Sequence, residues 1–258
     1  MVAVDLKRKL KYALVREPGL SFSKCITSHP LQHTINVSNA KKQHSAYCNT
    51  LTELGLEVIQ LPIDNERSDS CFVEDNAIIH NNKALITRMG AEVRRGEEVA
   101  VETALSDFMK TKKTIPPGTI EGGDVIHFPE HIICGVTKRT NLDGVDQMKN
   151  WLDVTVETVR DPNIVHLKSY VTFLGDDFII ATKKYINHPS LKNFRILIVD
   201  ESESYAANTL TIENTILIPK GFPRTLKLLN ETDYDVIPLD MREFQKCEGA
   251  LTCLSLLF

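Results

Sequence analysis

The feature that most constrains the fold is a module of short strands and one helix that recurs along the chain, with a period of about fifty residues. Apolar residues follow helical periodicity over five stretches, at 39–54, 97–110, 142–153, 186–193 and 222–230. One such module cannot bury both faces of its sheet alone, so the modules must pack on one another. The pattern predicts an α/β fold with radial repetition. A doubly wound sheet is the alternative.

Short β-rich runs flank these helices, separated by Gly and Asn turns. The clearest hairpin pairs Ala77 to His80 with Ala84 to Arg88 across Asn81-Asn82. Because such hairpins recur and no long parallel series appears, the radial arrangement is favoured over the doubly wound sheet. The other predicted strands are Tyr12 to Val15, Glu57 to Leu61, Val125 to Phe128, His131 to Val136, Thr155 to Val159, Phe178 to Ala181, Arg195 to Val199, Thr215 to Pro219 and Asp235 to Leu239.

The composition is that of a globular protein, with 42% hydrophobic and 25% charged residues in a chain of 258. No linker is rich in Pro or Ser, so we expect one domain over residues 1–258. No apolar run approaches the roughly 18 residues that cross a bilayer, which predicts a soluble, cytoplasmic protein with no membrane contact. A net charge of -4 gives no broad positive field, which excludes nucleic acid as a partner.

Neither a Gly-x-Gly-x-x-Gly motif nor a phosphate-binding loop occurs, so the usual nucleotide sites are excluded. The six cysteines stand at 25, 48, 71, 134, 247 and 253, with no Cys-x-x-Cys pair and no histidine grouping that suits zinc. We therefore expect no metal and no cofactor. Free thiols in a reducing cytoplasm fit this cysteine usage best.

Four clusters contain residues that could carry chemistry: Glu74 and Asp75 before a strand, Glu121 beside two glycines, His166 after an apolar pair, and Cys253 in an apolar tail. Each has an ordinary alternative. The acids suit solvated turns, His166 suits a hydrogen-bonded core position, and a buried cysteine is commonly inert. Together, however, a cysteine, a histidine and acids at separate strand ends are how a nucleophile and its base are assembled. A small molecule is the expected partner, and the sequence leaves a homodimer open.

The clusters also form an ordered series of motifs: Phe-Val-Glu-Asp at 72–75, Thr-Arg-x-Gly-Ala-x-x-Arg-Arg at 87–95, Glu-Gly-Gly-Asp at 121–124, Arg-Thr-Asn at 139–141, His-Leu-Lys-Ser at 166–169 and Cys-x-Ser-Leu at 253–256. In this order and spacing they resemble the dimethylarginine dimethylaminohydrolases, of the pentein or guanidino-group-modifying superfamily. The resemblance covers nearly the whole chain and implies a five-bladed α/β propeller of ββαβ modules.

The resemblance also implies an activity, the conversion of Nω-methylated arginine to citrulline and a methylamine. It implies Cys253 as the nucleophile, His166 as the general acid and base, and Glu121 as the acid that orients the histidine. Glu74 and Asp75 match the residues that hold the guanidinium nitrogens.

Further residues match the family's contacts to the rest of the substrate. Arg94 and Arg139 match the pair that binds the α-carboxylate, and Asp69 matches a residue near the α-amine. The remaining matches are Ile26 as the apolar lid residue, the carbonyl of Cys247 as a guanidinium contact and Ser169 as a support behind His166.

Lys168 bears on substrate choice, because deiminases of the superfamily typically carry an aspartate two residues after the histidine. With one acid missing, the far side of the guanidinium is less tightly bonded and can admit methyl groups. Arginine deimination and arginine amidinotransfer are the enzymatic alternatives, and a noncatalytic pentein binding protein is the alternative from another class. Glu248, where relatives carry aspartate, is expected to reshape the pocket near Cys253.

Overall fold

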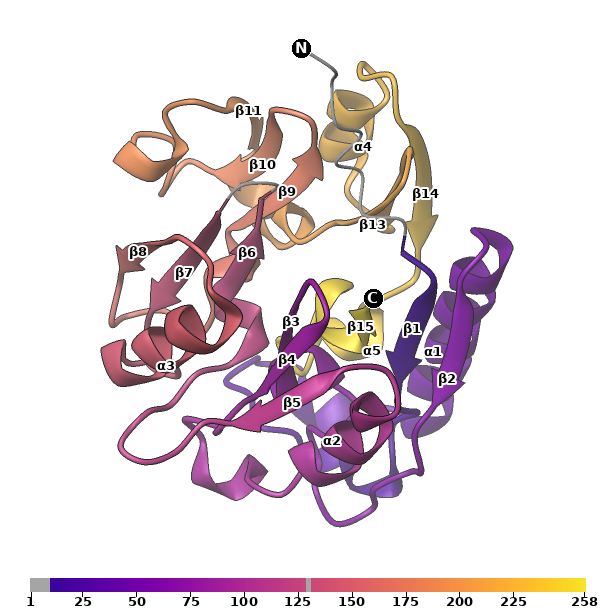
Figure 1. The fold of residues 1–258 in the computed structure, drawn as a ribbon. Coiled ribbons are helices and arrows are strands. Elements are labelled where there is room, and N and C mark those ends of the chain that lie inside the picture. Colours follow the sequence, from indigo (N-terminus) through magenta and orange to yellow (C-terminus); the bar gives the residue numbers. More distant parts are fainter. Residues whose placement is uncertain (1–9, 129–130) are drawn as a thin grey trace.

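The computed structural model describes residues 10–128 and 131–258, which form five separate three-stranded sheets. Figure 1 shows these sheets spaced around the middle of the molecule, where the C-terminal segment lies. Between one sheet and the next, the described residues make a single isolated bridge, Arg88 with Ile120. The predicted α/β fold of five similar modules is confirmed, and the doubly wound sheet is excluded.

The second module shows the repeating unit most clearly. Strand β3 (Ala77–His80) pairs antiparallel with β4 (Lys83–Ile86), and β4 pairs parallel with β5 (Lys110–Lys113). The parallel pairing needs a crossover, which helix α2 (Glu98–Ser106) supplies. Asn81 has a φ of 52° in the tight turn between β3 and β4, a conformation that asparagine tolerates well. The hairpin predicted from Asn81-Asn82 is confirmed.

The next three modules repeat this order of antiparallel hairpin and parallel crossover. Their elements are β6 (Val125–His127), β7 (Ile132–Val136), α3 (Leu142–Leu152) and β8 (Val156–Arg160); β9 (Val171–Gly175), β10 (Phe178–Thr182) and β11 (Arg195–Val199); and β12 (Leu210–Ile212), β13 (Thr215–Pro219), α4 (Pro223–Leu229) and β14 (Asp235–Leu239).

The two ends of the chain build the first module together. Strand β1 (Tyr12–Val15), helix α1 (Val37–Glu53) and strand β2 (Glu57–Gln60) come from the start of the chain, and β15 (Ser255–Leu257) comes from its end. β15 pairs antiparallel with β1, with Val15 opposite Ser255. The buried hydroxyl groups of Tyr47 and Ser255 are 2.7 Å apart and hydrogen-bonded. This closure fixes Cys253, two residues before β15, in the middle of the ring.

Two predicted helices differ from the structure, and several elements were not predicted. The helix expected at 186–193 is wrong, because only the 3-10 turn Pro189–Leu191 forms there; the residue before a proline is disfavoured in the α conformation. The helix expected at 97–110 ends at Ser106, and Lys110–Lys113 is instead strand β5, whose mostly exposed lysines hide any apolar alternation. Strands β9, β12 and β15 and the short helix α5 (Arg242–Gln245) were not predicted.

Apolar clusters between neighbouring modules hold the ring together. One cluster joins Leu14 of β1 and Leu256 of β15 to Ile79 of β3 and Ile86 of β4. Across residues 10–128 and 131–258, no helix is both long and apolar enough to cross a membrane.

The closure of the first module predicts the effect of Tyr47→Phe. This change leaves the buried Ser255 hydroxyl without its partner, so we expect the free energy of unfolding to fall by about 1–2 kcal/mol. Urea denaturation of both proteins measures the difference. An unchanged midpoint would show that the Tyr47–Ser255 contact does not stabilise the attachment of β15.

Candidate active site

Four short 3-10 turns lie against one another in the middle of the ring, and each carries one of the predicted chemical groups or lies directly beside it. These turns are η3 (Val73–Asn76), η5 (Gly122–Asp124), η6 (Leu167–Ser169) and η9 (Thr252–Leu254). Three of them come at the edge of a module, just before its first strand, and η9 comes just before β15. The repeated architecture thus gathers residues that are far apart in the sequence.

His166 and Glu121 form the closest pair of the site, with 2.7 Å between His166 Nε2 and Glu121 Oε2. Glu121 is fully buried, and its other oxygen, Oε1, accepts the backbone N–H of Gly90 at 2.9 Å. Gly123 permits this approach, because a Cβ there would lie 2.6 Å from Nδ1 of His166. The carboxylate therefore has a fixed orientation against the imidazole.

Asp75 is the second acid against the histidine, with Oδ1 at 3.7 Å from His166 Nε2. Its Oδ1 also accepts the backbone N–H of Gly123 at 3.0 Å, and its Oδ2 binds Arg94 Nη1 at 2.8 Å. Burial would raise the pKa of Asp75, but the charges of His166 and Arg94 outweigh it and lower the pKa to about 2. Asp75 is therefore ionised at neutral pH.

The two acids also set the charge of the imidazole. Burial alone would lower the pKa of His166, but Asp75 and the hydrogen bond to Glu121 oppose it and raise the pKa to about 9. At neutral pH His166 is an imidazolium and holds a proton that it can donate.

Asp124 supports the histidine from behind, a contact that the sequence analysis missed. Its Oδ1 accepts the backbone N–H of Leu167 at 2.9 Å, and its Oδ2 accepts the hydroxyl groups of Thr137 and Thr140 at 2.8 and 2.6 Å. Burial raises the pKa of Asp124 to about 6. The Glu-Gly-Gly-Asp motif contained the signal, because its second acid follows the same two glycines.

Glu74 lies on the side of the cluster nearest the C-terminal segment. Its Oε2 accepts the hydroxyl of Thr252 at 2.7 Å, and its Oε1 lies 2.5 Å from the ammonium of Lys168. Burial raises the pKa of Glu74 despite the lysine beside it. Lys168 therefore points into the site and contacts an acid that matches a guanidinium-binding residue.

Cys253 is half-buried next to these groups, and its backbone N–H donates to the carbonyl of Ala250 at 3.2 Å. Burial raises the pKa of its thiol far above the usual range, and the negative charges of Glu74 and Asp75 raise it further. Without a ligand the thiol is therefore protonated.

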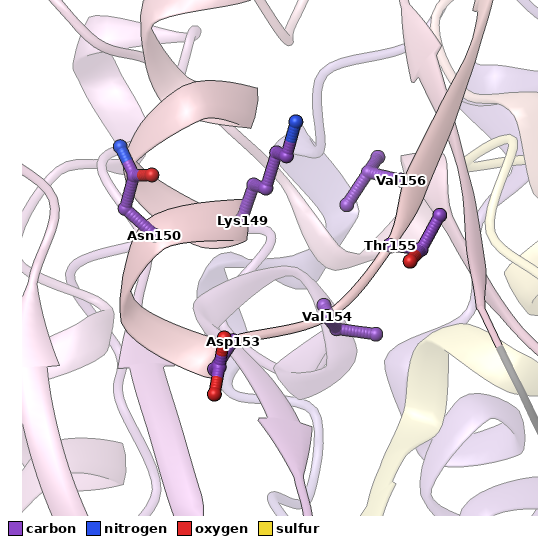
Figure 2. Close-up of a pocket in the computed structure, with 6 residues that line it drawn as sticks. All are labelled: Lys149, Asn150, Asp153, Val154, Thr155 and Val156. Carbon is purple, nitrogen blue, oxygen red and sulfur yellow. The ribbon is translucent and has the colours of Figure 1, made fainter.

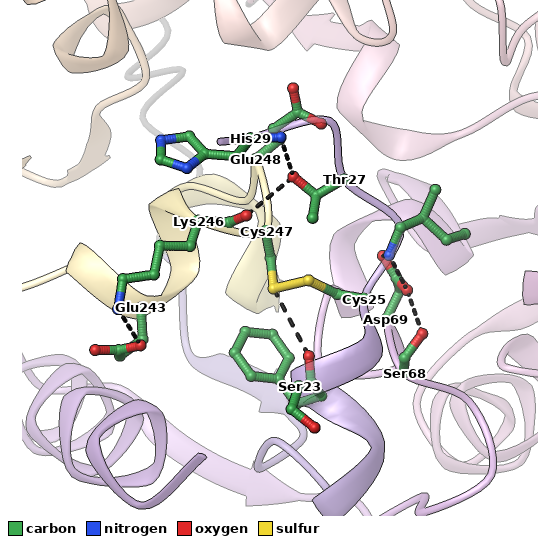
Figure 3. The surroundings of a disulfide bond; sticks show 12 residues. Ser23, Cys25, Thr27, His29, Ser68, Asp69, Glu243, Lys246, Cys247 and Glu248 are labelled. Carbon is green, nitrogen blue, oxygen red and sulfur yellow. Dashed lines mark hydrogen bonds and ion pairs between the residues drawn. A yellow bond between two sulfur atoms is a disulfide. The ribbon is translucent and has the colours of Figure 1, made fainter. Parts of the chain in front are cut away.

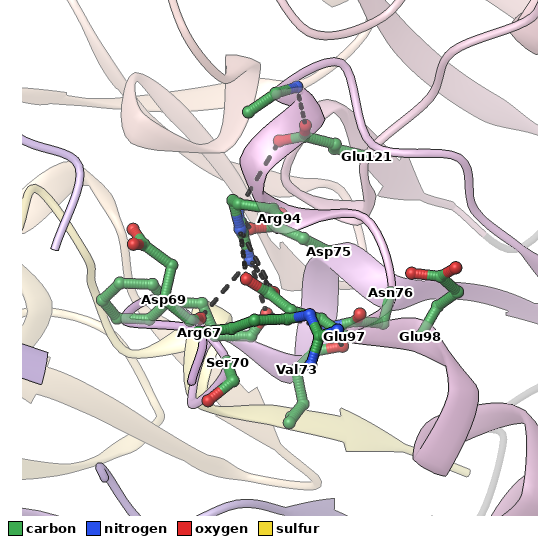
Figure 4. A network of polar contacts seen from close by, with 12 residues as sticks. Arg67, Asp69, Ser70, Val73, Asp75, Asn76, Arg94, Glu97, Glu98 and Glu121 are labelled. Atoms are coloured by element: carbon green, nitrogen blue, oxygen red, sulfur yellow. Dashed lines mark hydrogen bonds and ion pairs between the residues drawn. The ribbon is translucent and has the colours of Figure 1, made fainter. Parts of the chain in front are cut away.

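The two arginines of the resemblance have different surroundings. Arg94 is 4% exposed and binds Asp75 and Glu97, as Figure 4 shows. Arg139 is more exposed, and within the described chain its buried Nη1 has no hydrogen-bond partner, although Glu121 Oε1 lies 3.7 Å away. Arg139 therefore has an N–H group free for a ligand, whereas Arg94 is already occupied.

The lid segment around Ile26 is fastened at several points. The backbone N–H of Ile26 donates to Asp69 at 3.1 Å, and the Thr27 hydroxyl donates to the carbonyl of Lys246 at 2.9 Å. The Ser28 hydroxyl donates to Glu248 at 2.9 Å. Figure 3 shows the contact of Thr27 with Lys246 and the Asp69 carboxylate beside the lid.

A disulfide between Cys25 and Cys247 also ties the lid to the segment before Cys253. The expectation of free thiols is therefore wrong for these two cysteines, and right for Cys48, Cys71, Cys134 and Cys253. The two cysteines are 222 residues apart in sequence, and only the closing of the ring brings them together.

Two predicted residues lie away from the catalytic group. Ser169 ends turn η6 with its side chain exposed, and the described residues include no hydrogen bond from it to His166. The side chain of Cys247 is buried and turned toward Cys25, although its backbone still lies in the loop that leads to Cys253.

One oxygen each of Asp75 and Glu121 and one nitrogen of His166 lie within 4.8 Å of one another, close enough to surround a metal ion. These three side chains already have hydrogen-bond partners. Glu121 binds His166 and the backbone of Gly90, and Asp75 binds Arg94 and the backbone of Gly123. The set is therefore arranged as an acid–base group.

A hollow of about 380 Å³ lies elsewhere, at the C-terminal end of α3. Figure 2 shows that its wall carries no acid–base group comparable to that of the central turns. Its lining residues are Lys149, Asn150, Asp153, Val154, Thr155 and Val156.

Comparisons with known proteins agree with this geometry. Residues 22–250 match the profile of the family described as N,N dimethylarginine dimethylhydrolase, eukaryotic. The N(G),N(G)-dimethylarginine dimethylaminohydrolase of Pseudomonas aeruginosa is 33% identical over 96% of this chain and 99% of its own length. The enzyme of the same name from Streptomyces coelicolor is 35% identical over 95% and 96%.

Solved structures show the same relation. A mutant of the P. aeruginosa enzyme complexed with citrulline has a TM-score of 0.94 and covers 96% of this chain and 99% of its own. The N-terminal domain of ArgZ, an arginine dihydrolase from cyanobacteria, has a TM-score of 0.87 at 19% identity, which shows a shared fold alone, over 96% and 97% of the two chains.

The charge of His166 predicts a pH dependence of stability. Its pKa is about 9 in the folded protein against 6.5 when unperturbed, so its stabilising effect is complete below pH 6.5 and is lost as the pH rises through 9. Between about pH 7 and 9 we expect the free energy of unfolding to decrease as the pH rises. In His166→Asn we expect most of this dependence on pH to disappear. Denaturation at several pH values measures it. The exposed His33→Asn is the control, and an equal slope in both variants would contradict the assignment.

The disulfide leads to a prediction about hydrogen exchange in the lid. In a Cys25→Ala, Cys247→Ala double variant we expect severalfold faster hydrogen exchange at the amides of Ile26 and Ser28, because fewer fastenings hold them to Asp69 and Glu248. Cys48→Ala leaves these fastenings in place and serves as control. Equal exchange rates in all three proteins would show that the hydrogen bonds hold the lid without the disulfide.

Proposed function

The chain belongs to the dimethylarginine dimethylaminohydrolase family and is an enzyme of that type, and from this membership we propose that it hydrolyses Nω-methylated L-arginine to L-citrulline and a methylamine. The observation that carries the proposal is the contact between the turn that carries Cys253 and the turn that carries Glu74 and Asp75, with Asp75 facing the charged pair of His166 and Glu121. This arrangement offers negative charge for a guanidinium, a thiol for attack and a proton for the leaving group.

In the first step the substrate itself activates the thiol. Burial and the charges of Glu74 and Asp75 hold the thiol in its neutral form, and a guanidinium bound beside the two acids neutralises their charge and adds a positive charge near the sulfur. As the cation binds, the thiol releases its proton to solvent. The thiolate then bonds to the guanidinium carbon, whose C=N π pair moves onto nitrogen, giving a tetrahedral adduct. Ionisation thus coincides with substrate binding, which protects the thiol between turnovers.

His166 then transfers protons in both half-reactions. As an imidazolium, it protonates the departing methylamine and leaves a covalent thiouronium on Cys253. The neutral imidazole next takes a proton from water, which attacks the thiouronium carbon. The C–S bond then breaks, the sulfur takes up the remaining hydroxyl proton as a thiol, and citrulline is released. Glu121 keeps Nε2 in place throughout, because its own orientation is fixed by Gly90.

The amino-acid end of the substrate is assigned to the lid side of the site. Arg139 has an unpaired guanidinium N–H for the α-carboxylate. Asp69 offers a carboxylate for the α-amine, and Ile26 covers the ligand from the lid. We assign the Cys247 carbonyl to the guanidinium and give Ser169 no direct contact, since it is exposed.

Lys168 and Glu248 bear on the choice of substrate. Lys168 occupies the position of the deiminase aspartate and binds one oxygen of Glu74, which leaves the far guanidinium nitrogens without a second acid. Glu248 is exposed and binds Ser28, so its extra methylene lies toward the lid and away from the thiol. The lysine supports methylated arginine over free arginine, whose deimination is the alternative function.

Turnover measurements test the proposal. We expect a higher kcat/KM for asymmetric dimethylarginine or monomethylarginine than for arginine, with citrulline as product, and a loss of at least about a thousandfold in Cys253→Ser. Mass spectrometry of quenched wild-type enzyme detects the adduct on Cys253. A kcat/KM for arginine equal to or above that for methylarginine would favour the deiminase, and neither turnover nor adduct would leave a binding role.

Lys168→Asp tests the source of specificity. An aspartate here supplies the acid that deiminases carry, and a charge-assisted hydrogen bond is worth about 1.5–3 kcal/mol. We expect the ratio of kcat/KM for arginine over methylarginine to rise by about tenfold or more. Lys168→Met removes the ammonium without adding an acid and is the matched control. A ratio that is the same in both variants would remove Lys168 from the specificity argument.

A further inference from the structure

Every nitrogen of Arg94 contacts an acid or a carbonyl in this structure. Its Nε donates to both oxygens of Glu97 at 3.2 Å, and its Nη2 donates to Glu97 Oε2 at 2.9 Å. Nη2 also lies 3.4 Å from the carbonyl of Phe72, and Nη1 donates to Asp75 at 2.8 Å. Figure 4 shows the guanidinium between the two acids. Arg94 thus links the catalytic acid Asp75 to a second acid outside the site.

Glu97 is well placed to hold this arginine. It is 1% exposed and directly precedes helix α2, whose N-terminus favours a negative charge. Its backbone carbonyl accepts Arg16 Nη2 at 3.3 Å, and Arg16 is itself buried. Glu97 is therefore fixed by the scaffold, and it presents both carboxylate oxygens to one edge of the Arg94 guanidinium.

We infer that Glu97 is a positioning residue for the hydrolysis: by binding Nε and Nη2 of Arg94 it directs Nη1 onto Asp75 and so fixes Asp75 against His166. The inference rests on the proposed function for its kinetic consequence. It assigns a role to a residue that has no contact with the reacting atoms.

The charges from Glu97 through Arg94 and Asp75 to His166 explain why the contact of Glu97 with Arg94 matters. Asp75 is held between Arg94 at 2.8 Å and Gly123 N–H at 3.0 Å, with His166 at 3.7 Å. A carboxylate with two fixed partners cannot turn away from the imidazole. If Glu97 is neutral, it no longer balances the positive charge of Arg94, which then acts more strongly on Asp75. The negative potential at His166 falls as a result.

Replacing Glu97 leaves the other charged side chains that face Glu97 and His166 in the sequence. Around Glu97 these are Arg94, Arg16, Asp69 and Asp75. Around His166 they are Asp75, Glu121 and Asp124. Burial raises the pKa of Glu97 to about 7, with Arg94 opposing the rise, so the acid carries a substantial charge at neutral pH.

The test replaces Glu97 with Gln and with Asp, and Glu92 with Gln. Glu92 is the matched control, because it also pairs with an arginine three residues away, Arg95, at 2.8 Å, but on the surface. We expect Glu97→Gln to lower kcat for monomethylarginine by about 10- to 100-fold with KM changed less than about threefold. Glu97→Asp keeps the charge and recovers part of kcat, and Glu92→Gln has wild-type kinetics.

A second readout needs no substrate. We expect the NMR titration of the His166 imidazole in the ligand-free protein to move to lower pH in Glu97→Gln and to stay unchanged in Glu92→Gln. If Glu97→Gln does not fold, as judged by circular dichroism, Glu97→Asp carries both measurements, and we expect a smaller loss of kcat in the same direction.

Three results would overturn the inference: wild-type kcat in folded Glu97→Gln, a rise in KM without a fall in kcat, or an unchanged His166 titration. A rise in KM alone would mean that Arg94 serves the substrate carboxylate. The proposed function fails separately, through absence of methylarginine turnover in the wild type. In that case the His166 titration still decides whether Glu97 positions Asp75.

Discussion

The site depends on the pairing of buried charges around Asp75. This carboxylate is almost fully buried, where an isolated charge would be very costly, and it remains ionised because Arg94 and His166 lie on its two sides. The same pairing keeps His166 protonated, and burial together with the negative charges of Glu74 and Asp75 keeps the Cys253 thiol neutral. The resting site is therefore arranged to receive one further positive charge. In the proposed function a guanidinium supplies that charge, so that recognition of the substrate and activation of Cys253 are one electrostatic event.

The repeated modules make this pairing achievable in a small chain. Each acid or base is carried by a turn at the edge of a three-stranded sheet or directly beside such a turn, and the sheets are arranged around the middle of the molecule. Strand β15 completes the sheet that begins with β1, which brings the end of the chain to the same place. The Cys25–Cys247 disulfide and the contact of Ser28 with Glu248 then connect the lid to the segment that carries Cys253. Lid and nucleophile are thus built as one unit.

The modules could be predicted from the sequence, and the residues of the acid–base group from the resemblance. Contacts between segments far apart in the chain could not. Asn81-Asn82 identified a hairpin through local turn chemistry, and the motifs around Glu121, His166 and Cys253 identified the site through resemblance. Strand β5 was missed because three lysines in an exposed edge strand leave no apolar alternation, and the helix near Pro189 was wrong because the proline outweighed a weak periodicity. The Cys25–Cys247 bond and the grip of Glu97 on Arg94 could not be predicted, since the first joins opposite ends of the chain and the second depends on which nitrogen faces which acid.

The most direct measurement is the ionisation of the Cys253 thiol with and without a bound cation. Thiolate absorbance near 240 nm, taken as the difference between wild type and Cys253→Ser, can be titrated in the ligand-free protein and in the presence of methylguanidine, the smallest methylated analogue of the substrate's charged end. The account predicts a thiol that is protonated at neutral pH without ligand and that ionises at lower pH when methylguanidine is bound, with the shift reduced in Glu74→Gln. A thiolate already present at neutral pH in the ligand-free protein, or a titration that methylguanidine leaves unchanged, would contradict it.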